Sequence, residues 1–280
     1  MLNKITLYIA LFFVASVLGA CEQSDPPSTI PENEGGDLHF SGYYWNIKNS
    51  GTGQMGPGPN YFSASPDNVW LDQDSLLHLR ITKRNNLWYC SEVISSKEFG
   101  YGTYVFTVAG GLTTINEKAI FGLFTWSDYT FMDQANSEVD IEFARWNNAN
   151  DSLLLTYSVQ PVWFDNPSPY LERTRRPQMA VSKLQSPTTH VFTWTPDTIF
   201  WKSYEGENYP SSNLMASWQY DKSNIARSKL EGGRTSSPIV IPAPLTTTNV
   251  RFNLWLLFGQ PPASGAETEV VIKRFEFHPL

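Results

Sequence analysis

Short apolar runs alternate with turn residues along the chain after residue 36. The runs are rich in Val, Ile, Thr and aromatic residues, and clusters of Gly, Pro, Asn and Ser separate them. This part of the chain shows no helical period of apolar residues, no internal repeat and no linker. Many short strands with turn signals between them are typical of an all-β sandwich or jelly roll. We expect strands at residues 76–83, 89–95, 102–108, 120–126, 138–143, 153–159, 190–195, 198–203, 249–258 and 269–277.

The run at 251–258 has two different faces. Its even positions are all apolar, so we expect them in the core between two antiparallel sheets: Phe252, Leu254, Leu256 and Phe258. The opposite face carries Arg251, Asn253 and Trp255. An indole stacks on a pyranose ring and a carboxamide bonds its hydroxyls, so this face suits a sugar-binding groove. An amphipathic surface strand would show the same pattern.

Three acidic residues share one face of the strand expected at 138–143. Side chains alternate along a strand, so Glu138, Asp140 and Glu142 point away from the core that the intervening apolar residues enter. Acidic residues are depleted in strands, and neighbouring carboxylates raise one another's pKa. Stability gives no reason for this arrangement. A glycoside hydrolase needs it, because it uses one ionised and one protonated carboxyl group.

The spacing of the two glutamates predicts the shape of the sheet. Positions i and i+4 lie about 13 Å apart along a flat strand, whereas the carboxyl groups of a retaining glycosidase lie about 5–5.5 Å apart. We therefore expect a bent sheet whose concave groove lies on the acidic side. A solvated polar face and a calcium site are the alternatives. Calcium usually takes its ligands from loops that wrap the ion, so a calcium site ranks well below catalysis for these strand residues. The sequence indicates no cofactor and no structural calcium ion.

The motif Glu138-x-Asp140-x-Glu142 resembles that of glycoside hydrolase family sixteen, whose concanavalin-like jelly rolls cleave β-linked polysaccharides with retention. The resemblance extends over most of the chain and includes residues 56–60, 99–104, 122–126, 190–194 and 253–255. It implies that Glu138 is the nucleophile, that Glu142 is the general acid/base, and that Asp140 bonds the nucleophile and helps to set the proton balance.

Six residues are candidates for substrate binding. Two of them, Trp126 and Trp146, have core packing as an equally weighted alternative. The candidates are Asn60, Trp126, Arg145, Trp146, Asn253 and Trp255.

The sequence departs from the family at positions that bear on the substrate. Asn136-Ser137 stands where lichenases typically have Trp-Asp, and many laminarinases carry an extra residue before the final Glu that is absent here. These departures argue against a plain lichenase or laminarinase specificity. The resemblance as a whole implies a retaining endo-acting glycosidase that acts on a β-glucan or related polysaccharide. A transglycosylase and a non-catalytic, lectin-like jelly roll stay open as alternatives.

The N-terminus predicts export. Lys4, an apolar run over residues 5–18 and the sequence Leu-Gly-Ala before Cys21 have the layout of a lipoprotein signal peptide, and the run is too short for a comfortable membrane span. We expect cleavage after residue 20, a lipid on Cys21, a flexible tether over 21–36 and one domain over 37–280. The protein would then be anchored to a bacterial outer membrane or cell surface. Cys90 would be a buried, unreactive thiol.

Composition excludes some partners. The chain has 280 residues, 17% charged and 14% aromatic, with 20 basic against 27 acidic residues and a formal net charge of −7. Nucleic-acid binders cluster Lys and Arg, so a nucleic-acid partner is not expected. We expect a monomer. The basic stretch 173–176 is assigned to a solvated loop, with binding of sulfate or uronate groups as the alternative.

Overall fold

The computed structural model describes residues 36–130, 134–160, 162, 173–221, 223 and 241–280. The predicted signal peptide, the lipidation site Cys21 and all of the predicted tether except Gly36 lie outside the described residues. No helix among the described residues is long and apolar enough to cross a membrane.

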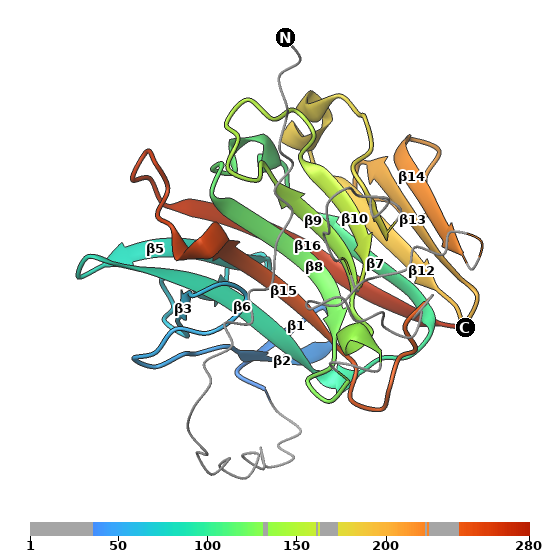
Figure 1. Ribbon diagram of the computed structural model, residues 1–280, viewed down its shortest axis with the longest axis horizontal. Coiled ribbons are helices and arrows are strands. Elements are labelled where there is room, and N and C mark those ends of the chain that lie inside the picture. Colours follow the sequence, from blue (N-terminus) through green and yellow to red (C-terminus); the bar gives the residue numbers. More distant parts are fainter. Residues whose placement is uncertain (1–35, 131–133, 161, 163–172, 222, 224–240) are drawn as a thin grey trace, which may run out of the picture.

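The described part of the chain is built from strands and short 3₁₀ turns (Figure 1). The strands are β1 (Leu38–Phe40), β2 (Tyr43–Ile47), β3 (Tyr61–Phe62), β4 (Val69–Leu71), β5 (Leu77–Arg84), β6 (Leu87–Glu98), β7 (Gly102–Val108), β8 (Ala119–Trp126), β9 (Val139–Ala144), β10 (Leu155–Val159), β11 (Thr174–Arg175), β12 (Thr188–Trp194), β13 (Thr198–Glu205), β14 (Leu214–Asp221), β15 (Asn249–Leu256) and β16 (Thr268–Pro279). The 3₁₀ turns are η1 (Leu112–Thr114), η2 (Ala135–Ser137), η4 (Val181–Gln185) and η5 (Leu257–Gly259).

Two antiparallel layers form the predicted sandwich. The groove sheet runs β1-β2-β6-β15-β8-β9-β10-β11, and the back sheet runs β4-β5-β16-β7-β12-β13-β14. The β5–β6 hairpin joins the two layers, and the short strand β3 adds a parallel pairing to β6. The all-β antiparallel fold expected from the sequence is therefore confirmed.

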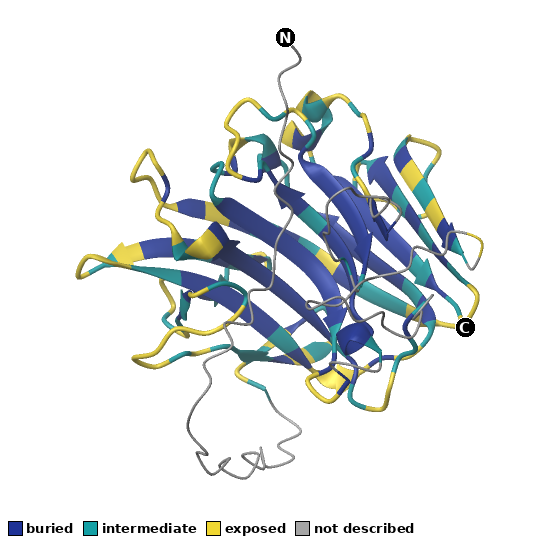
Figure 2. Ribbon diagram, in the orientation of Figure 1, coloured by how far each residue is buried: buried dark blue, intermediate teal, exposed yellow. Residues whose placement is uncertain are grey.

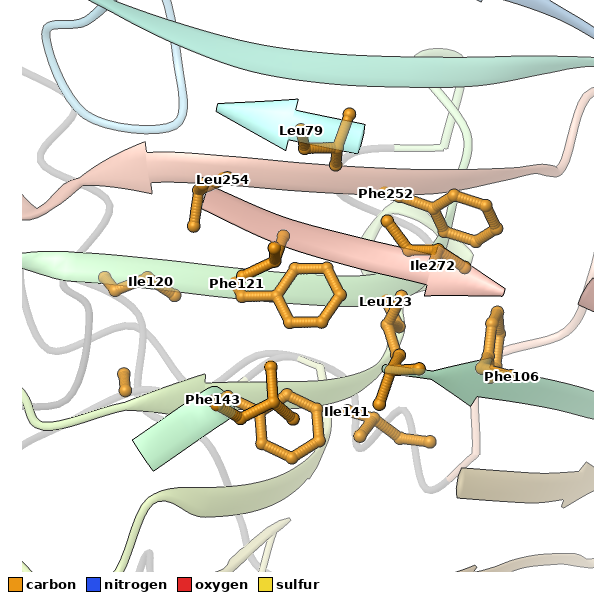
Figure 3. Close-up of a cluster of buried hydrophobic side chains, with 14 of the residues drawn as sticks. Leu79, Phe106, Ile120, Phe121, Leu123, Ile141, Phe143, Phe252, Leu254 and Ile272 are labelled. Atoms are coloured by element: carbon orange, nitrogen blue, oxygen red, sulfur yellow. The ribbon is translucent and has the colours of Figure 1, made fainter. Parts of the chain in front are cut away.

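The core lies between the two sheets and follows the predicted alternation. On β9 the buried apolar side chains of Val139, Ile141 and Phe143 face inward. Side chains from both sheets meet there (Figure 3), and the rings of Phe106 and Phe252 pack edge to face with centroids 5.8 Å apart. The central strands are buried along most of their length, while exposed residues gather in loops and along the outer strand β14 (Figure 2).

One predicted core residue lies elsewhere. Phe258 is 46% exposed, although the alternation on β15 predicts it to be buried. The strand ends at Leu256, and Phe258 adopts a left-handed backbone with φ of 55° within η5. The alternation therefore stops before it reaches this side chain.

Two further predictions concern single features. Cys90 is buried on β6 as expected, and burial raises the pKa of its thiol to about 12. The basic stretch is not simply a solvated loop, because Arg173 is buried and donates to the phenol oxygen of Tyr220 at 2.6 Å. Arg176 forms an ion pair with Asp151 at 2.8 Å. These two arginines support the fold.

Candidate active site

A cavity of about 470 Å³ opens on the face of the groove sheet that points away from the core. Its floor comes from β6, β15, β8, β9 and β10, and its walls come from the loops that follow β2 and β8. It is lined by Lys48, Asn49, Met55, Gly56, Pro57, Glu92, Ile94, Gly122, Phe124, Trp126, Asp128, Glu138, Asp140, Glu142, Ser158, Gln160, Val162, Arg251, Asn253 and Trp255.

Strand register brings residues distant in sequence into one row across the floor. Glu142 on β9 pairs with Gly122 on β8, and Gly122 pairs with Asn253 on β15. The same row continues to Glu92 on β6, which pairs with Asn253. Since paired residues of neighbouring strands share a face, these side chains all project into the groove.

A second row passes through Asp140. This residue pairs with Phe124 on β8 and with Ser158 on β10. Beyond Phe124, the row reaches Arg251 on β15. The predicted acidic residues thus lie beside the polar and aromatic face of β15, which the sequence also assigns to the groove.

A left-handed turn positions Glu138 directly before β9. Ala135, Asn136 and Ser137 have φ of 46°, 58° and 53°, which is unfavourable for residues with a side chain. Hydrogen bonds hold the turn: the backbone N–H of Ser127 donates to the Asn136 carbonyl at 2.6 Å. Glu138 itself has extended backbone, and β9 begins one residue later.

The hydroxyl of Thr125 joins the turn to the strand. It donates to the Ser137 carbonyl at 2.8 Å and accepts from the backbone N–H of Val139 at 3.2 Å. These bonds grip the main chain on both sides of Glu138. The direction in which that side chain leaves the backbone is therefore fixed by a buried residue of β8.

Burial keeps the three carboxyl groups from ionising together. It raises the pKa of Glu142 well above its usual range, and the charge of Asp140 raises it further. The pKa of Glu138 is raised by burial, then by Asp140 and Glu142 and by a hydrogen bond with Asp140, while Arg251 acts in the opposite direction. Like charges confined to a dry site share protons.

Asp140 is placed to exchange a proton with Glu138. Burial raises its pKa to about 7, although hydrogen bonds from Gln160 and with Glu138 act to lower it. The Gln160 amide donates to its carboxyl oxygen at 3.3 Å. A group that titrates near neutrality can exchange a proton with a neighbouring carboxyl group.

The amide of Asn253 lies over Gly122 in the row that leads to Glu142. A Cβ at position 122 would come within 2.6 Å of Asn253 Oδ1, so only glycine leaves room for it. This oxygen is buried and has no hydrogen-bond partner among the described residues. An unsatisfied buried acceptor in a groove is suited to receive a hydroxyl group.

The other half of the groove holds paired charges. The carboxylate of Glu92, whose side chain is 1% exposed, accepts from Lys48 at 2.9 Å and from Arg251 at 3.4 Å. Arg251 also pairs with Asp128 at 2.8 Å. The charges of these four side chains balance.

Three candidates for substrate binding line the groove as expected: Trp126, Asn253 and Trp255. Trp126 is half-buried, and its indole N–H donates to Asp128 at 2.7 Å. Trp255 is 6% exposed at the end of the floor near the loop that carries Gly58.

Three other candidates are not among the groove residues. Arg145 donates to the main-chain carbonyls of Asp151 and Thr113, so it braces loops. Trp146 packs into the core at 4% exposure, because its left-handed backbone with φ of 49° ends the alternation of β9. Asn60 donates to the Leu256 carbonyl at 2.8 Å and anchors the loop that forms one wall.

Sequence reasoning missed part of the site. Glu92 and Gly122 lie on predicted strands, and the alternation of those strands holds the signal for their direction. Lys48 and Asp128 reach the groove from loops, where periodicity gives no direction. Arg251 was assigned to the groove face but not to a role.

The fold has known relatives among solved structures, although no family model and no curated protein matches the sequence. The β-glucanase of Bacillus licheniformis is 17% identical with a TM-score of 0.56, over 87% of this chain and 95% of that chain. A laminarinase from Flavobacterium sp. UMI-01 is 12% identical with a TM-score of 0.58, over 84% and 92%. Rv0315 of Mycobacterium tuberculosis, described as a pseudo β-1,3-glucanase, is 18% identical with a TM-score of 0.54, over 84% and 91%. The chain thus has the jelly-roll fold of the β-glucanases.

Proposed function

We propose that this protein is a retaining, endo-acting glycoside hydrolase of family sixteen that cleaves a β-linked polysaccharide. The observation that carries the proposal is the set of three carboxyl groups, the buried Glu138 and Asp140 and the half-buried Glu142, which line one groove with raised pKa values. The shared fold with β-glucanases supports it.

The first step uses Glu142 as acid and Glu138 as nucleophile. Glu142 gives its proton to the glycosidic oxygen as that bond to the anomeric carbon breaks, and Glu138 forms a bond to the same carbon. Its raised pKa keeps Glu142 protonated until this moment. In the free protein the hydrogen bond between the two groups raises the pKa of Glu138 and lowers that of Asp140, so the shared proton lies on Glu138. Glu138 must attack as a carboxylate, so this proton passes to Asp140 before the attack.

The second step reverses the role of Glu142. Now ionised, it takes a proton from a water molecule, whose oxygen bonds to the anomeric carbon as the bond to Glu138 breaks. Two displacements at one carbon retain the β configuration. A sugar hydroxyl in place of water would give transglycosylation by the same groups.

The proposed substrate is a β-glucan or a related polysaccharide. Trp126 offers a ring for a pyranose, Trp255 contributes an apolar edge to the end of the floor, and the free Oδ1 of Asn253 offers an acceptor for a hydroxyl. With the lipobox at Cys21, the enzyme would act outside the cell while tethered to a bacterial membrane.

The test is a substrate panel with matched variants. Purified protein is incubated with laminarin, lichenan, xyloglucan, agar and porphyran, products are sized, and the configuration of the new reducing end is followed by proton NMR. We expect shortened chains with β product first, and a loss of roughly 10³-fold or more for Glu138→Gln and Glu142→Gln. Glu269→Gln, on the back sheet, is the control. If the purified protein binds these glycans but cleaves none of them, the result would support the lectin-like alternative.

Chemical rescue separates the two roles. Azide can replace either missing carboxylate but enters at different steps. Glu138→Ala should yield an α-glycosyl azide by one displacement, and Glu142→Ala should yield a β-glycosyl azide by two. Exchanged products would reverse the assignment.

A further inference from the structure

Arg251 is placed where a chain bound in the groove would pass, yet each of its three nitrogens already bonds within the protein. Its side chain is 8% exposed. Its Nε donates to Asn249 at 2.9 Å, and its two terminal nitrogens pair with Glu92 and Asp128. The arginine is therefore held on three sides by other residues.

The same guanidinium lies over the ring of Trp126, 5.6 Å from the ring centroid. Asp128 completes the arrangement, because one of its carboxylate oxygens accepts the indole N–H at 2.7 Å and the other accepts from Arg251 at 2.8 Å. Two contacts from one ion pair, one to the ring face and one to the ring nitrogen, thus fix the orientation of the indole.

Trp126 is the groove residue of β8 nearest to Glu138 along the strand ladder. Phe124 and Asp140 form the last pair of the β8–β9 ladder, and Trp126 and Glu138 each lie two residues beyond that pair, at the same end of the two strands. Both side chains line the groove. If Glu138 is the nucleophile, an indole in this position would lie beside the sugar ring whose anomeric carbon Glu138 attacks.

We propose that Arg251 and Asp128 are positioning residues that clamp Trp126 beside Glu138, and that Arg251 also places its positive charge next to the carboxyl cluster. The catalytic meaning of the clamp rests on the proposed glycosidase function. The clamp itself is a statement about the protein alone.

Several charged groups around Glu138 shift its pKa, and Arg251 is one of them. Asp140 and Glu142 on β9 raise the pKa of Glu138, whereas Arg251 on β15 lowers it. Glu92 and Lys48 form a pair farther along the row, and Asp128 lies in the loop after β8. Among the described neighbours of Glu138, Arg251 is the cation that favours its ionised form.

An anion-binding subsite is the competing role for an arginine in a groove. The pairing of Arg251 with the buried carboxylate of Glu92 and with Asp128 argues against it. Binding a sulfate or uronate group would add a third anion beside Glu92 and Asp128, so that Glu92 would be less neutralised by Arg251.

The first experiment needs no turnover. Carboxyl carbon-13 NMR titration, with the Glu138 signal assigned by Glu138→Gln, measures that pKa in wild type, Arg251→Met and Asp128→Asn. We expect a rise of roughly one unit in Arg251→Met and no rise in Asp128→Asn, which keeps the arginine charge and removes only an exposed negative charge. The indole N–H signal of Trp126, assigned by Trp126→Phe, should shift in both variants. An unmoved Glu138 pKa in Arg251→Met, or an unshifted indole signal, would overturn the proposal.

Kinetics on a cleaved glucan form the second arm. Both variants should raise KM by roughly 5- to 10-fold, because both loosen Trp126, but only Arg251→Met should move the acidic limb of the pH profile upward. Arg251→Lys keeps the charge and loses the fork geometry, so it should keep the limb and raise KM. If Arg251→Met does not fold, Arg251→Lys still tests whether the fork geometry of the arginine holds Trp126, through the expected rise in KM. Stronger binding of sulfated than of neutral oligosaccharides, lost in Arg251→Met, would show an anion subsite instead.

Discussion

The indole N–H of Trp201, on the back sheet, donates to the main-chain carbonyl of Asp140, on the groove sheet, at 3.1 Å. Trp201 is fully buried and stacks between the rings of Tyr157 and Trp218. The strand that carries the candidate catalytic groups is therefore fixed from behind, by a polar bond that crosses the core.

Trp201→Phe tests this connection. It retains the ring but removes the N–H, so we expect a loss of about 1–2 kcal/mol in the free energy of unfolding and a fall in kcat larger than the change in KM. Urea denaturation and steady-state kinetics measure the two effects. Trp218→Phe, in the same stack, should lower stability without the selective fall in kcat. Equal kinetic effects would refute a role for the bond.

Gly122→Ala probes the space above the glycine. The new methyl group would lie 2.6 Å from Asn253 Oδ1 and would push the amide out of its row. We expect kcat/KM to fall at least 10-fold with little change in melting temperature, since the amide moves into an open groove. Gly100→Ala is the control, because a Cβ there meets nothing within 4 Å. Equal activity of the two variants would exclude Asn253 from substrate binding.

Asp140→Asn should exchange activity for stability. The folded-state pKa of Asp140 is raised to about 7 from 3.8, so ionisation destabilises the fold increasingly as pH rises through that interval. The variant should be more stable than wild type by roughly 1–4 kcal/mol at pH 8, with the difference shrinking toward pH 4. Urea unfolding across this range measures it. A constant difference would mean that Asp140 titrates normally.

His190 should act on stability with the opposite sign. Burial lowers its pKa to about 3 from 6.5, and its ring nitrogens bond to Ser203 and Thr188 at 2.7 and 2.8 Å. The unfolded chain binds a proton between these values, so stability falls as pH drops from 6.5 toward 3, by up to about 5 kcal/mol. His190→Gln should show a smaller fall than wild type over the same range in urea titrations.

Arg145→Met tests the reassignment of a residue that the sequence placed in substrate binding. Because Arg145 holds the carbonyls of Asp151 and Thr113, its loss should cost about 1–3 kcal/mol of stability. KM should stay within twofold of wild type. A large rise in KM without a loss of stability would return Arg145 to the groove.

The sequence predicts those parts of the site that follow strand alternation. Glu138, Asp140, Glu142, Asn253 and Trp255 all face the groove, because each lies on or directly before a regular strand. Trp146 and Phe258 were misplaced for a common reason: left-handed backbone, with φ of 49° and 55°, ends the alternation just before each side chain. Nothing in a list of residue types marks where a non-glycine residue will adopt that conformation.

The charged half of the groove was hidden for a different reason. Lys48 and Asp128 come from loops, and their partners Glu92 and Arg251 lie on strands far away in the sequence. Only the assembled sheet brings them together. The sequence does not predict short strands such as β3 and β11, of two residues each, for a similar reason. Two residues show no alternation, and these strands form only because longer strands lie beside them.

The paired cations also set how the groove meets its ligand. Lys48 and Arg251, the cationic side chains among the described groove residues, both have carboxylate partners. The carboxylate partners cancel the long-range attraction that these two cations would exert on a polyanionic polysaccharide. An uncharged polysaccharide is not attracted by the electrostatic field of the groove. Encounter should proceed by unsteered diffusion, at a rate that changes little with ionic strength.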